Sequence, residues 1–318
     1  MEQKEAGQKI TAYKGLDMDF RGRGFQYEAG KEYKSGKTVK VCRSGFHACT
    51  NPLEVWDYYP VCNSRFAEVE LGGVIDKEDG SSKICSSEIK IKKELTLSDY
   101  IGLCVAWMNN LTKVGGYSSQ IGSSGDYAKI GSSGDYAQIG SSGNSSQIGS
   151  SGDYAQIGSS GYSAKIGSSG NSAQIGSSGY SAKIGSSGDS SQIGSSGNSA
   201  QIGSSGDYAQ IGSSGDYAQI GSSGNSAQIG SSGNYAQIGS SGDYAQIGSS
   251  GYSAVIMCAG IKSKAKAKKG SWITLSEWEI EDERYVPVCV KTEQVDGVKI
   301  KEDTWYELKG GVFVETTD

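Results

Sequence analysis

The residues around the single histidine have the side chains best suited to chemistry. His47 stands between Cys42 and Cys49, and imidazole and thiolate groups are the usual ligands of structural zinc. The C-x4-H-x-C spacing matches no common zinc site, and cysteines are often simply small buried residues. We therefore expect no metal and no cofactor here. His47 and an acid such as Glu68 are the candidate catalytic residues, although a lone histidine after a tight turn is more often hydrogen-bonded for structural reasons.

A second group of candidates is a row of lysines near the end of the chain. Residues 261–268 alternate with a period of two, so an extended strand places four lysines on one side. These are Lys262, Lys264, Lys266 and Lys268. Such a row can bind phosphate or nucleic acid, but lysines also protect the open end of a sheet from aggregation. Both interpretations stay open, and residues 277–283 are acidic enough to face the lysines.

Tyrosine and aspartate rows within a repeat form the third group of candidates. Residues 121–255 repeat nine residues fifteen times, as Ile-Gly-Ser-Ser-Gly-(Asp/Asn/Tyr)-(Tyr/Ser)-(Ala/Ser)-(Gln/Lys), with a single Val at the last place. The candidate binding residues are Tyr136, Tyr154, Tyr208, Tyr217, Tyr244, Asp135, Asp153, Asp207 and Asp243. Side chains fixed in rows would bind a partner at little ordering cost. Tyrosine also favours β structure by itself, and this explanation has equal weight.

A solenoid is the element that must position these rows. A fixed short period indicates stacked units, and alternation places Ile and Ala inside with Tyr and Gln or Lys outside. The Gly-Ser-Ser-Gly segment suits a turn, and so much glycine excludes a helix. A flexible Gly/Ser linker is the alternative, but a linker has no reason to keep Ile at every ninth place. Because nine residues are too few to enclose a core, we expect two copies, or 18 residues, per coil.

The variable positions support pairing of the copies. Numbered from Ile121, the three copies with Lys are odd, and so are the three with Tyr at the sixth position, whereas Asp at that position is mainly in even copies. Odd and even copies would then form two chemically different sides. The sequence thus predicts a mainly β protein with a two-sided solenoid over 116–260, a small N-terminal α+β domain over 1–115, and a capping coil with a small β-rich tail over 261–318.

The two flanks contain several shorter predicted elements. In the N-terminal flank we expect strands at 10–14, 21–27, 30–33, 38–42, 65–71 and 87–93, and helices at 53–59 and 97–110. Asn51 would cap the first helix, with Pro52 in its first turn. In the C-terminal flank, Trp272, Ile273, Leu275 and Trp278 are expected to plug the solenoid core. Asp296–Gly297 is expected to be a hairpin turn.

The N-terminal flank has specific motifs spread over about 100 residues. They are Tyr13-Lys14-Gly15, Gly24-Phe25-Gln26-Tyr27, Gly30-Lys31-Glu32-Tyr33, Cys42-Arg43-Ser44-Gly45-Phe46-His47-Ala48-Cys49, Pro52 and Tyr58-Tyr59-Pro60. With the Gly270-Ser271-Trp272-Ile273 tail, this layout resembles an uncharacterised family of phage and prophage proteins. The resemblance implies a phage context and no established activity. The order of elements around His47 is also loosely similar to ADP-ribosyltransferases, but no Arg-Ser-Glu or His-Tyr-Glu pattern is convincingly spaced.

Composition limits the classes of function. The chain of 318 residues has a net charge of −5, which argues against a general nucleic-acid binder. Its seven cysteines are odd in number and contain no CxxC pair, which is typical of a reducing compartment. The sequence shows neither a signal peptide nor a long apolar segment, so we expect no membrane association. The expected location is the cytoplasm of an infected or lysogenic bacterium.

Three functions follow from different classes. The leading hypothesis is a non-enzymatic phage-type scaffold that engages or sequesters a host protein, as an inhibitor or against a host defence; a homo-oligomer stays open. The second is a DNA mimic that uses the aspartate row against a DNA-handling enzyme. The third is an ADP-ribosyltransferase-like enzyme in the N-terminal domain, displayed on the rod.

Overall fold

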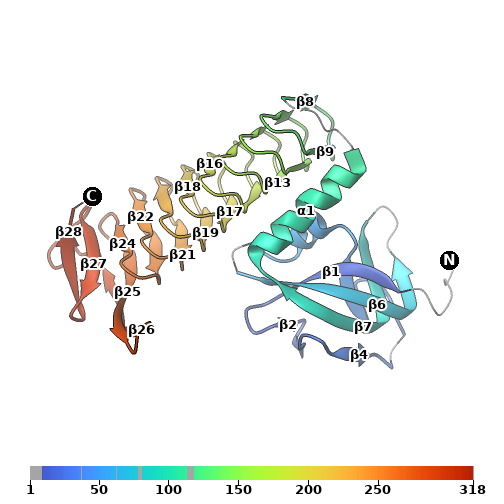
Figure 1. Ribbon diagram of the computed structural model, residues 1–318, viewed down its shortest axis with the longest axis horizontal. Coiled ribbons are helices and arrows are strands. Elements are labelled where there is room, and N and C mark those ends of the chain that lie inside the picture. The colour runs from blue at the N-terminus through green and yellow to red at the C-terminus, as the bar shows by residue number, and fades with distance from the viewer. Residues whose placement is uncertain (1–8, 37, 62, 78–80, 113–117, 318) are drawn as a thin grey trace. The chain divides into compact units, whose positions relative to one another are not determined.

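The computed structural model describes residues 9–36, 38–61, 63–77, 81–112 and 118–317. The chain divides into two compact units, 1–107 and 108–318 (Figure 1). The first is a small sheet with helices, and the second is a β-solenoid with a short strand cap. The predicted fold class, mainly β with a two-sided solenoid between an N-terminal domain and a C-terminal cap, is confirmed.

The N-terminal unit contains a curled antiparallel sheet with the order β4-β7-β5-β1-β6. Its strands are β1 (Ile10–Leu16), β4 (Glu32–Lys34), β5 (Phe46–Cys49), β6 (Arg65–Lys77) and β7 (Lys83–Leu95). Because β6 also pairs with β7, the strands β7, β5, β1 and β6 form a closed ring. The ring is tight everywhere except between β1 and β5, which share the single residue pair Tyr13 and Cys49.

Two helices belong to this part of the chain, at the predicted places. The first, η1 (Pro52–Asp57), is a 3-10 helix, and the Asn51 side chain caps it by accepting the Leu53 N–H at 3.0 Å. The second, α1 (Leu97–Thr112), begins after Thr96, whose hydroxyl accepts the Asp99 N–H at 3.1 Å. Tyr100 of α1 stacks on Phe66 of β6 with ring centroids 4.1 Å apart.

Two predicted strands of this unit are wrong. Residues 21–27 form a hairpin of β2 (Arg21–Gly22) and β3 (Phe25–Gln26), because Arg23 and Gly24 both adopt positive φ, 51° and 77°. Residues 38–42 form no strand in the part that the structure describes. The segment turns at Cys42, with φ of 65°, and makes one isolated bridge between Lys40 and Ser44.

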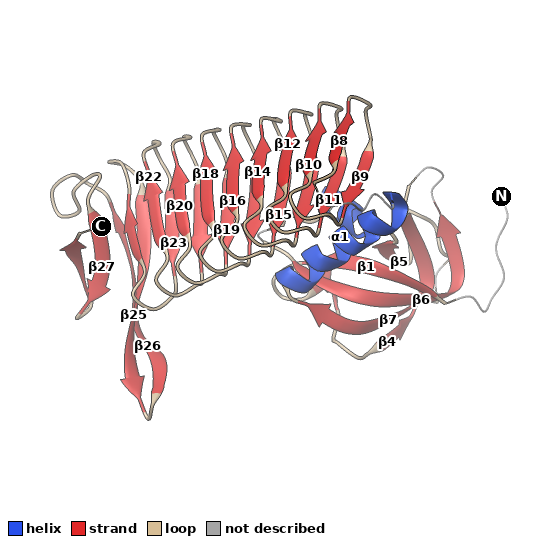
Figure 2. Cartoon of the chain, turned by 45° about the horizontal axis from the view of Figure 1, so that its top comes forward, coloured by secondary structure: helices blue, strands red, loops and turns tan. Residues whose placement is uncertain are grey.

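The solenoid winds 18 residues per coil, as two parallel sheets on opposite sides (Figure 2). The 11-stranded sheet contains β8 (Gln120–Ser123), β10 (Gln138–Ser141), β12 (Gln156–Ser159), β14 (Gln174–Ser177), β16 (Gln192–Ser195), β18 (Gln210–Ser213), β20 (Gln228–Ser231), β22 (Gln246–Ser249) and β24 (Lys264–Lys266). The 10-stranded sheet contains β9 (Lys129–Ser132), β11 (Gln147–Ser150), β13 (Lys165–Ser168), β15 (Lys183–Ser186), β17 (Gln201–Ser204), β19 (Gln219–Ser222), β21 (Gln237–Ser240) and β23 (Val255–Cys258). Odd and even copies therefore lie on different sheets.

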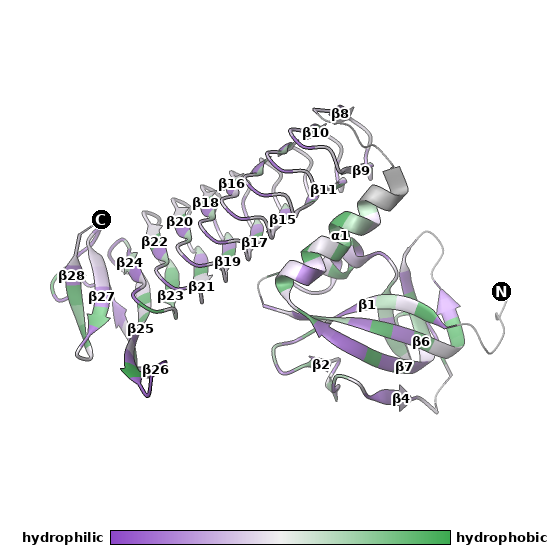
Figure 3. Ribbon diagram, in the orientation of Figure 1, coloured by the Kyte–Doolittle hydropathy of each residue, from purple (hydrophilic) through white to green (hydrophobic). Residues whose placement is uncertain are grey.

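The solenoid core has one row more than its sequence pattern indicated. Most strands read Gln-Ile-Gly-Ser, and three have Lys in place of Gln, so Ile and Ser point inward while Gln or Lys and Gly point outward. Ile157, Ala155 and Ser159 are all buried, and the core rows are thus Ile, Ala and the first Ser of each copy. The expectation of a core of Ile and Ala alone is wrong, because this serine belongs to the strand and not to the turn. Near-neutral and hydrophilic colours cover most of the coils in Figure 3.

Two hairpins continue the sheets and close the solenoid. The strands β25 (Trp272–Glu281) and β26 (Arg284–Gln294) extend the 10-stranded sheet, and β27 (Trp305–Lys309) and β28 (Val312–Thr316) extend the 11-stranded one. Ile273 and Leu275 are buried as expected, but Trp272 is 45% exposed; the other buried plugging residues are Val295, Ile300, Tyr306 and Leu308. Asp296–Gly297 is not a hairpin turn. The Asp296 carboxylate instead accepts three backbone N–H groups of the following loop.

Candidate functional site

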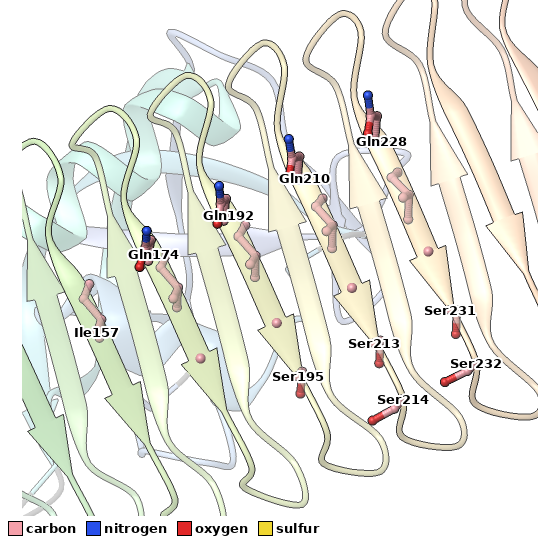
Figure 4. Close-up of a pocket in the computed structure, with 18 of the residues that line it drawn as sticks. Ile157, Gln174, Gln192, Ser195, Gln210, Ser213, Ser214, Gln228, Ser231 and Ser232 are labelled. Carbon is pink, nitrogen blue, oxygen red and sulfur yellow. The ribbon is translucent and has the colours of Figure 1, made fainter. Parts of the chain in front are cut away.

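The outward side of the 11-stranded sheet carries a long shallow groove of about 1720 Å³. The groove runs along the outward Gln and Gly residues of the 11-stranded sheet, from β8 to β22. We call this outward surface the glycine face. Figure 4 shows Gln174, Gln192 and Gln210 in line, one from each coil. Among the described residues that line the groove, only Lys266 and Asp303 are charged, and both lie at its capped end.

The glycines of this face are not required by the fold. A Cβ added at Gly158, Gly176, Gly194 or Gly212 meets no atom within 4 Å, and none of them has positive φ. By contrast, a Cβ on Gly170, at the fifth position of its copy, would lie 1.9 Å from the carbonyl oxygen of Gly152. Glycine weakens a strand and commonly marks the close approach of another molecule. The glycine face therefore leaves its backbone open where the fold alone would accept a side chain.

The five candidate tyrosines do not form one surface. Tyr136, Tyr154, Tyr208 and Tyr244 follow strands of the 10-stranded sheet, whereas Tyr217 lies at the opposite corner. The structure stacks Tyr136 on Tyr154, with centroids 5.0 Å apart and planes at 8°. All five have φ of 56° to 58°, a conformation that serines share at other copies.

The candidate aspartates share one corner and have a structural role there. Asp135, Asp153, Asp207 and Asp243 each accept, through Oδ1, the backbone N–H of the residue 18 positions later, at 2.7 to 3.0 Å. Asn171 does the same for the N–H of Asp189, at 2.9 Å. Asp and Asn can therefore replace each other at the sixth position of the repeat, because either side chain provides this acceptor oxygen.

The terminal lysines are largely engaged by the cap. Lys264 is buried, and its Nζ donates to the carbonyl oxygen of Thr317 at 2.9 Å. Lys264 and Lys266 both lie over the Trp305 ring, and Lys268 forms an ion pair of 2.5 Å with Asp303. Lys262 lies over the Tyr244 ring at 5.9 Å and is exposed.

The acidic segment 277–283 was expected to face these lysines, but Glu277 is used differently. Its carboxylate accepts the N–H groups of Gly310 and Gly311 in the turn between β27 and β28, at 2.5 and 2.8 Å. The acid that meets the lysine row is instead Asp303.

The N-terminal unit contains a second candidate, a cavity of about 540 Å³ where β1 and β5 part. Lys14 and Gly15 line it from β1, and Phe46 and His47 from β5. Its rim includes the β2–β3 hairpin, where Gly22 lies so close to β1 that an added Cβ would be 3.3 Å from the Lys14 side chain. Tyr59 lies directly over Gly15, whose missing side chain makes room for the ring.

The charges around this cavity have one sign. The cations that line it are Lys14, Arg23, Lys34, Arg43 and Lys83, and no described Asp or Glu lines it. Lys34 pairs with Glu88 at 2.9 Å. The other four have no carboxylate partner among the residues that the structure describes, and Lys83 instead contacts the Cys42 thiol at 3.2 Å and the Tyr58 ring. We call this site the cationic cavity.

Lys14 is the most unusual of these cations because it is only 6% exposed. Its Nζ donates to the carbonyl oxygen of His47 at 2.8 Å and lies 5.1 Å from the centre of the Tyr27 ring. Burial, with a smaller effect of Arg23, lowers the pKa of Lys14 to about 8. An ammonium group has three donors, so hydrogen-bonding capacity remains for a ligand.

His47 anchors a loop beside this cavity. Its Nε2 accepts the N–H of Cys42 at 3.0 Å, which holds the turn between Lys40 and Ser44. Burial, together with a smaller effect of the nearby Arg23, Lys14 and Lys83, lowers the pKa of His47 to about 4. A general base works best with a pKa near the operating pH, so this histidine is poorly matched to that task.

Glu68, the candidate acid, lies away from His47. It is on β6, separated from β5 by β1, and it forms an ion pair of 2.5 Å with Lys92. It does not line the cationic cavity. The structure therefore does not bring the two candidate catalytic residues together.

The cysteines around His47 form no metal centre in the part of the chain that the structure describes. Cys49 is buried, and burial, together with the nearby Glu54, raises the pKa of its thiol to about 12. The six described cysteines are free thiols, and Cys62 lies outside the described residues. No helix within the described ranges is both long and apolar enough to span a membrane.

Comparison with known proteins places the cationic cavity inside a recognised domain. Residues 10–103 are a DUF7666 domain, a domain of unknown function. This range includes all the strands of the N-terminal unit and every residue that lines the cavity. No curated protein and no solved structure matches the chain.

Sequence reasoning missed both the glycine face and the cationic cavity. The strand glycines were assigned to turns, so their outward position was not seen. The cations come from five separate segments, and only the closed ring of strands brings them together. One signal was available: Lys14, Phe25, Tyr27, His47 and Tyr59 belong to the motifs of the N-terminal flank, and all line the cavity.

Proposed function

We propose that the protein is a non-enzymatic binding protein, in which the solenoid is a scaffold and the glycine face binds a protein partner. The observation that supports this most is the row of strand glycines that neither φ nor packing requires. The sixth to ninth positions of the repeat vary among the fifteen copies, whereas the outward strand position is glycine in every copy, on this sheet and on the other. A repeating face without a charge along most of its length suits a partner that contacts backbone and amide groups.

The partner is most simply a bacterial host protein. This part of the proposal rests on the likeness of the N-terminal motifs to phage and prophage proteins, which implies action in the cytoplasm of an infected or lysogenic cell. Binding would then engage or sequester the host protein.

The test replaces glycines of the face by valine at Gly176, Gly194 and Gly212. The fold should be kept, because each site has room for a side chain and valine favours strands; we expect each change to raise the free energy of unfolding by up to about 1 kcal/mol. Binding should be lost, because three methyl-bearing side chains fill the groove. Quantitative affinity capture from a bacterial lysate, with thermal unfolding of each variant, measures both effects.

Gly239→Val is the matched control, because Gly239 has the same strand position and the same free space but lies on β21 of the other sheet. A host protein retained by the wild type and by Gly239→Val, and lost from the triple variant, supports the proposal. If the triple variant retains every partner, the glycine face is not the binding surface. If only self-association changes, measured by analytical ultracentrifugation, the face joins copies of this chain and the host-partner proposal is wrong.

The two alternative functions have less support. In the DNA-mimic hypothesis the aspartate row must present its charge, yet Asn171 and Asn225 interrupt the row, and each candidate carboxylate has one oxygen committed to the backbone. In the ADP-ribosyltransferase hypothesis a histidine and an acid must act on one substrate, and His47 and Glu68 do not share a cavity.

A further inference from the structure

The cationic cavity is a concave site of the N-terminal unit that neither the scaffold role nor the glycine face uses. Its volume of about 540 Å³ falls within the range of roughly 300–1,000 Å³ that is usual for small-molecule sites. It opens where two neighbouring strands, β1 and β5, separate after one residue pair. Beyond that pair the two strands exchange no ladder hydrogen bonds, and the Lys14 ammonium group instead donates to the His47 carbonyl oxygen of β5.

The charge of the cavity indicates the chemistry of its occupant. Burying an ammonium group without a carboxylate is costly, and Lys14 is buried among Arg23, Arg43 and Lys83 with no acid in the lining. Arg23 and Arg43 are exposed and, among the described residues, form no ion pair or side-chain hydrogen bond that would hold them elsewhere. Guanidinium groups match phosphate geometry especially well.

Two of the cations are carried by tight turns with positive φ. Arg23 has φ of 51° and Cys42, next to Arg43, has φ of 65°. Non-glycine residues in this region are uncommon and tend to gather at functional sites. The His47 side chain fixes the second of these turns through the Cys42 N–H. Both arginines therefore stand on turns that the protein keeps in place at the cavity mouth.

Aromatic rings supply the remaining walls. Phe25 and Tyr58 both line the cavity and are 44% and 49% exposed, which is high for large rings. Phe25 is held by edge contacts with Tyr27, Tyr33 and Phe46 at centroid distances of 4.8, 5.2 and 6.0 Å. An exposed ring that is rigidly held offers a flat apolar ligand a stacking surface at little entropic cost.

We propose that the cationic cavity binds a phosphorylated ligand with a planar aromatic ring, and that the ligand class is a nucleotide. Lys14, Arg23 and Arg43 bind the phosphate groups, and Phe25 and Tyr58 contact the base. His47 acts as a positioning residue that holds the Cys42–Arg43 turn. The proposal concerns binding alone and includes no bond-making step.

Isothermal titration of the full-length protein tests this, with ADP, inorganic pyrophosphate and adenosine as probes. We expect ADP to bind with a defined stoichiometry of one, and adenosine and pyrophosphate each to bind more weakly. Arg23→Ala combined with Arg43→Ala should weaken ADP binding by roughly 10- to 100-fold, because charged hydrogen bonds are lost. The affinity should also fall as salt is raised.

Lys14→Met separates a binding role from a structural one. Methionine fills the same space without charge, so the free protein should melt at a higher temperature, while ADP binding is lost. Lys92→Ala, on the outer side of the ring and paired with Glu68, is the control and should bind ADP like the wild type.

Three results would overturn the inference. One is that ADP does not bind the folded wild-type chain. Another is that ADP binds equally well to Lys14→Met and to the double arginine variant. The third is that pyrophosphate binds as tightly as ADP, which would make the cavity an anion site that does not recognise a base.

Discussion

At the scale of single residues, glycine has two opposite roles in the same nine-residue copy. The glycine at the fifth position is fixed by packing, since a side chain at Gly170 would collide with the carbonyl of Gly152. The glycine at the second position has free space on the glycine face, so packing within the fold does not require it there. Sequence alone treats both as turn formers, because a glycine carries no side chain whose direction could separate the two cases.

His47 gives a pH prediction at this scale. Its pKa is lowered to about 4 in the folded protein, from an ordinary value of 6.5, so the unfolded chain takes up the proton first as the pH falls. The stability that this difference provides is present above about pH 6.5 and is lost as the pH falls toward 4. We expect the free energy of unfolding of the wild type to fall more steeply over this window than that of His47→Gln.

Urea denaturation at several pH values measures the slopes. Since His47 is the only histidine of the chain, no other imidazole contributes to the difference. Equal slopes for the two proteins would show that His47 is not held in its neutral form.

At the scale of elements, the stacking of one coil on the next depends on side chains as well as on strand ladders. The Asp and Asn rows add one hydrogen bond per coil at each corner where they occur. The sequence predicted the coil, because Ile recurs at every ninth place. It also predicted α1, because apolar residues recur there at helical spacing. It did not reveal the Ser row, since serine is polar and was expected in the turn, nor the ring of β7, β5, β1 and β6, whose pairings join distant segments.

The corner ladder can be tested at Asp207. Asp207→Ala removes the acceptor for the Asn225 N–H, at 2.7 Å, and should lower the free energy of unfolding by about 0.5–1.5 kcal/mol. Asp207→Asn keeps an acceptor oxygen and should stay close to the wild type. Chemical denaturation followed by circular dichroism compares the two.

The difference in stability between Asp207→Ala and Asp207→Asn separates the effect of the acceptor oxygen from the effect of the charge. If the loss of charge in Asp207→Asn destabilises as much as the loss of the whole side chain, the residue acts through its charge, and the ladder interpretation is wrong.

At the scale of the molecule, the solenoid is a stack of near-identical units between two different ends. Its interactions are almost all between neighbouring coils, so its stability is roughly a sum over coils. The predicted two-sided rod follows from this regularity. The candidate binding residues could not be assigned to surfaces in the same way: Tyr217 lies at another corner from Tyr136, and the terminal lysines meet a cap whose folding the repeat does not encode.

Removing one whole coil tests this independence. Deletion of residues 175–192 joins Gln174 to Ile193 and keeps every later strand in its own sheet. We expect a folded protein that keeps its cooperative unfolding, with a small loss in the free energy of unfolding. Deletion of 175–191 is the control, because one coil must then close with one residue too many. Equal stability of the two deletion proteins would contradict coils of fixed 18-residue length.

The pairing of copies also restricts how such a gene can change. Gain or loss of an even number of copies lengthens or shortens the rod while each row continues along its own side. An odd number would turn everything beyond that point by half a revolution, splitting the aspartate row between two corners. Natural variants of this protein should therefore differ mostly by pairs of copies, and a census of their lengths would reveal whether selection acts on orientation or only on reach.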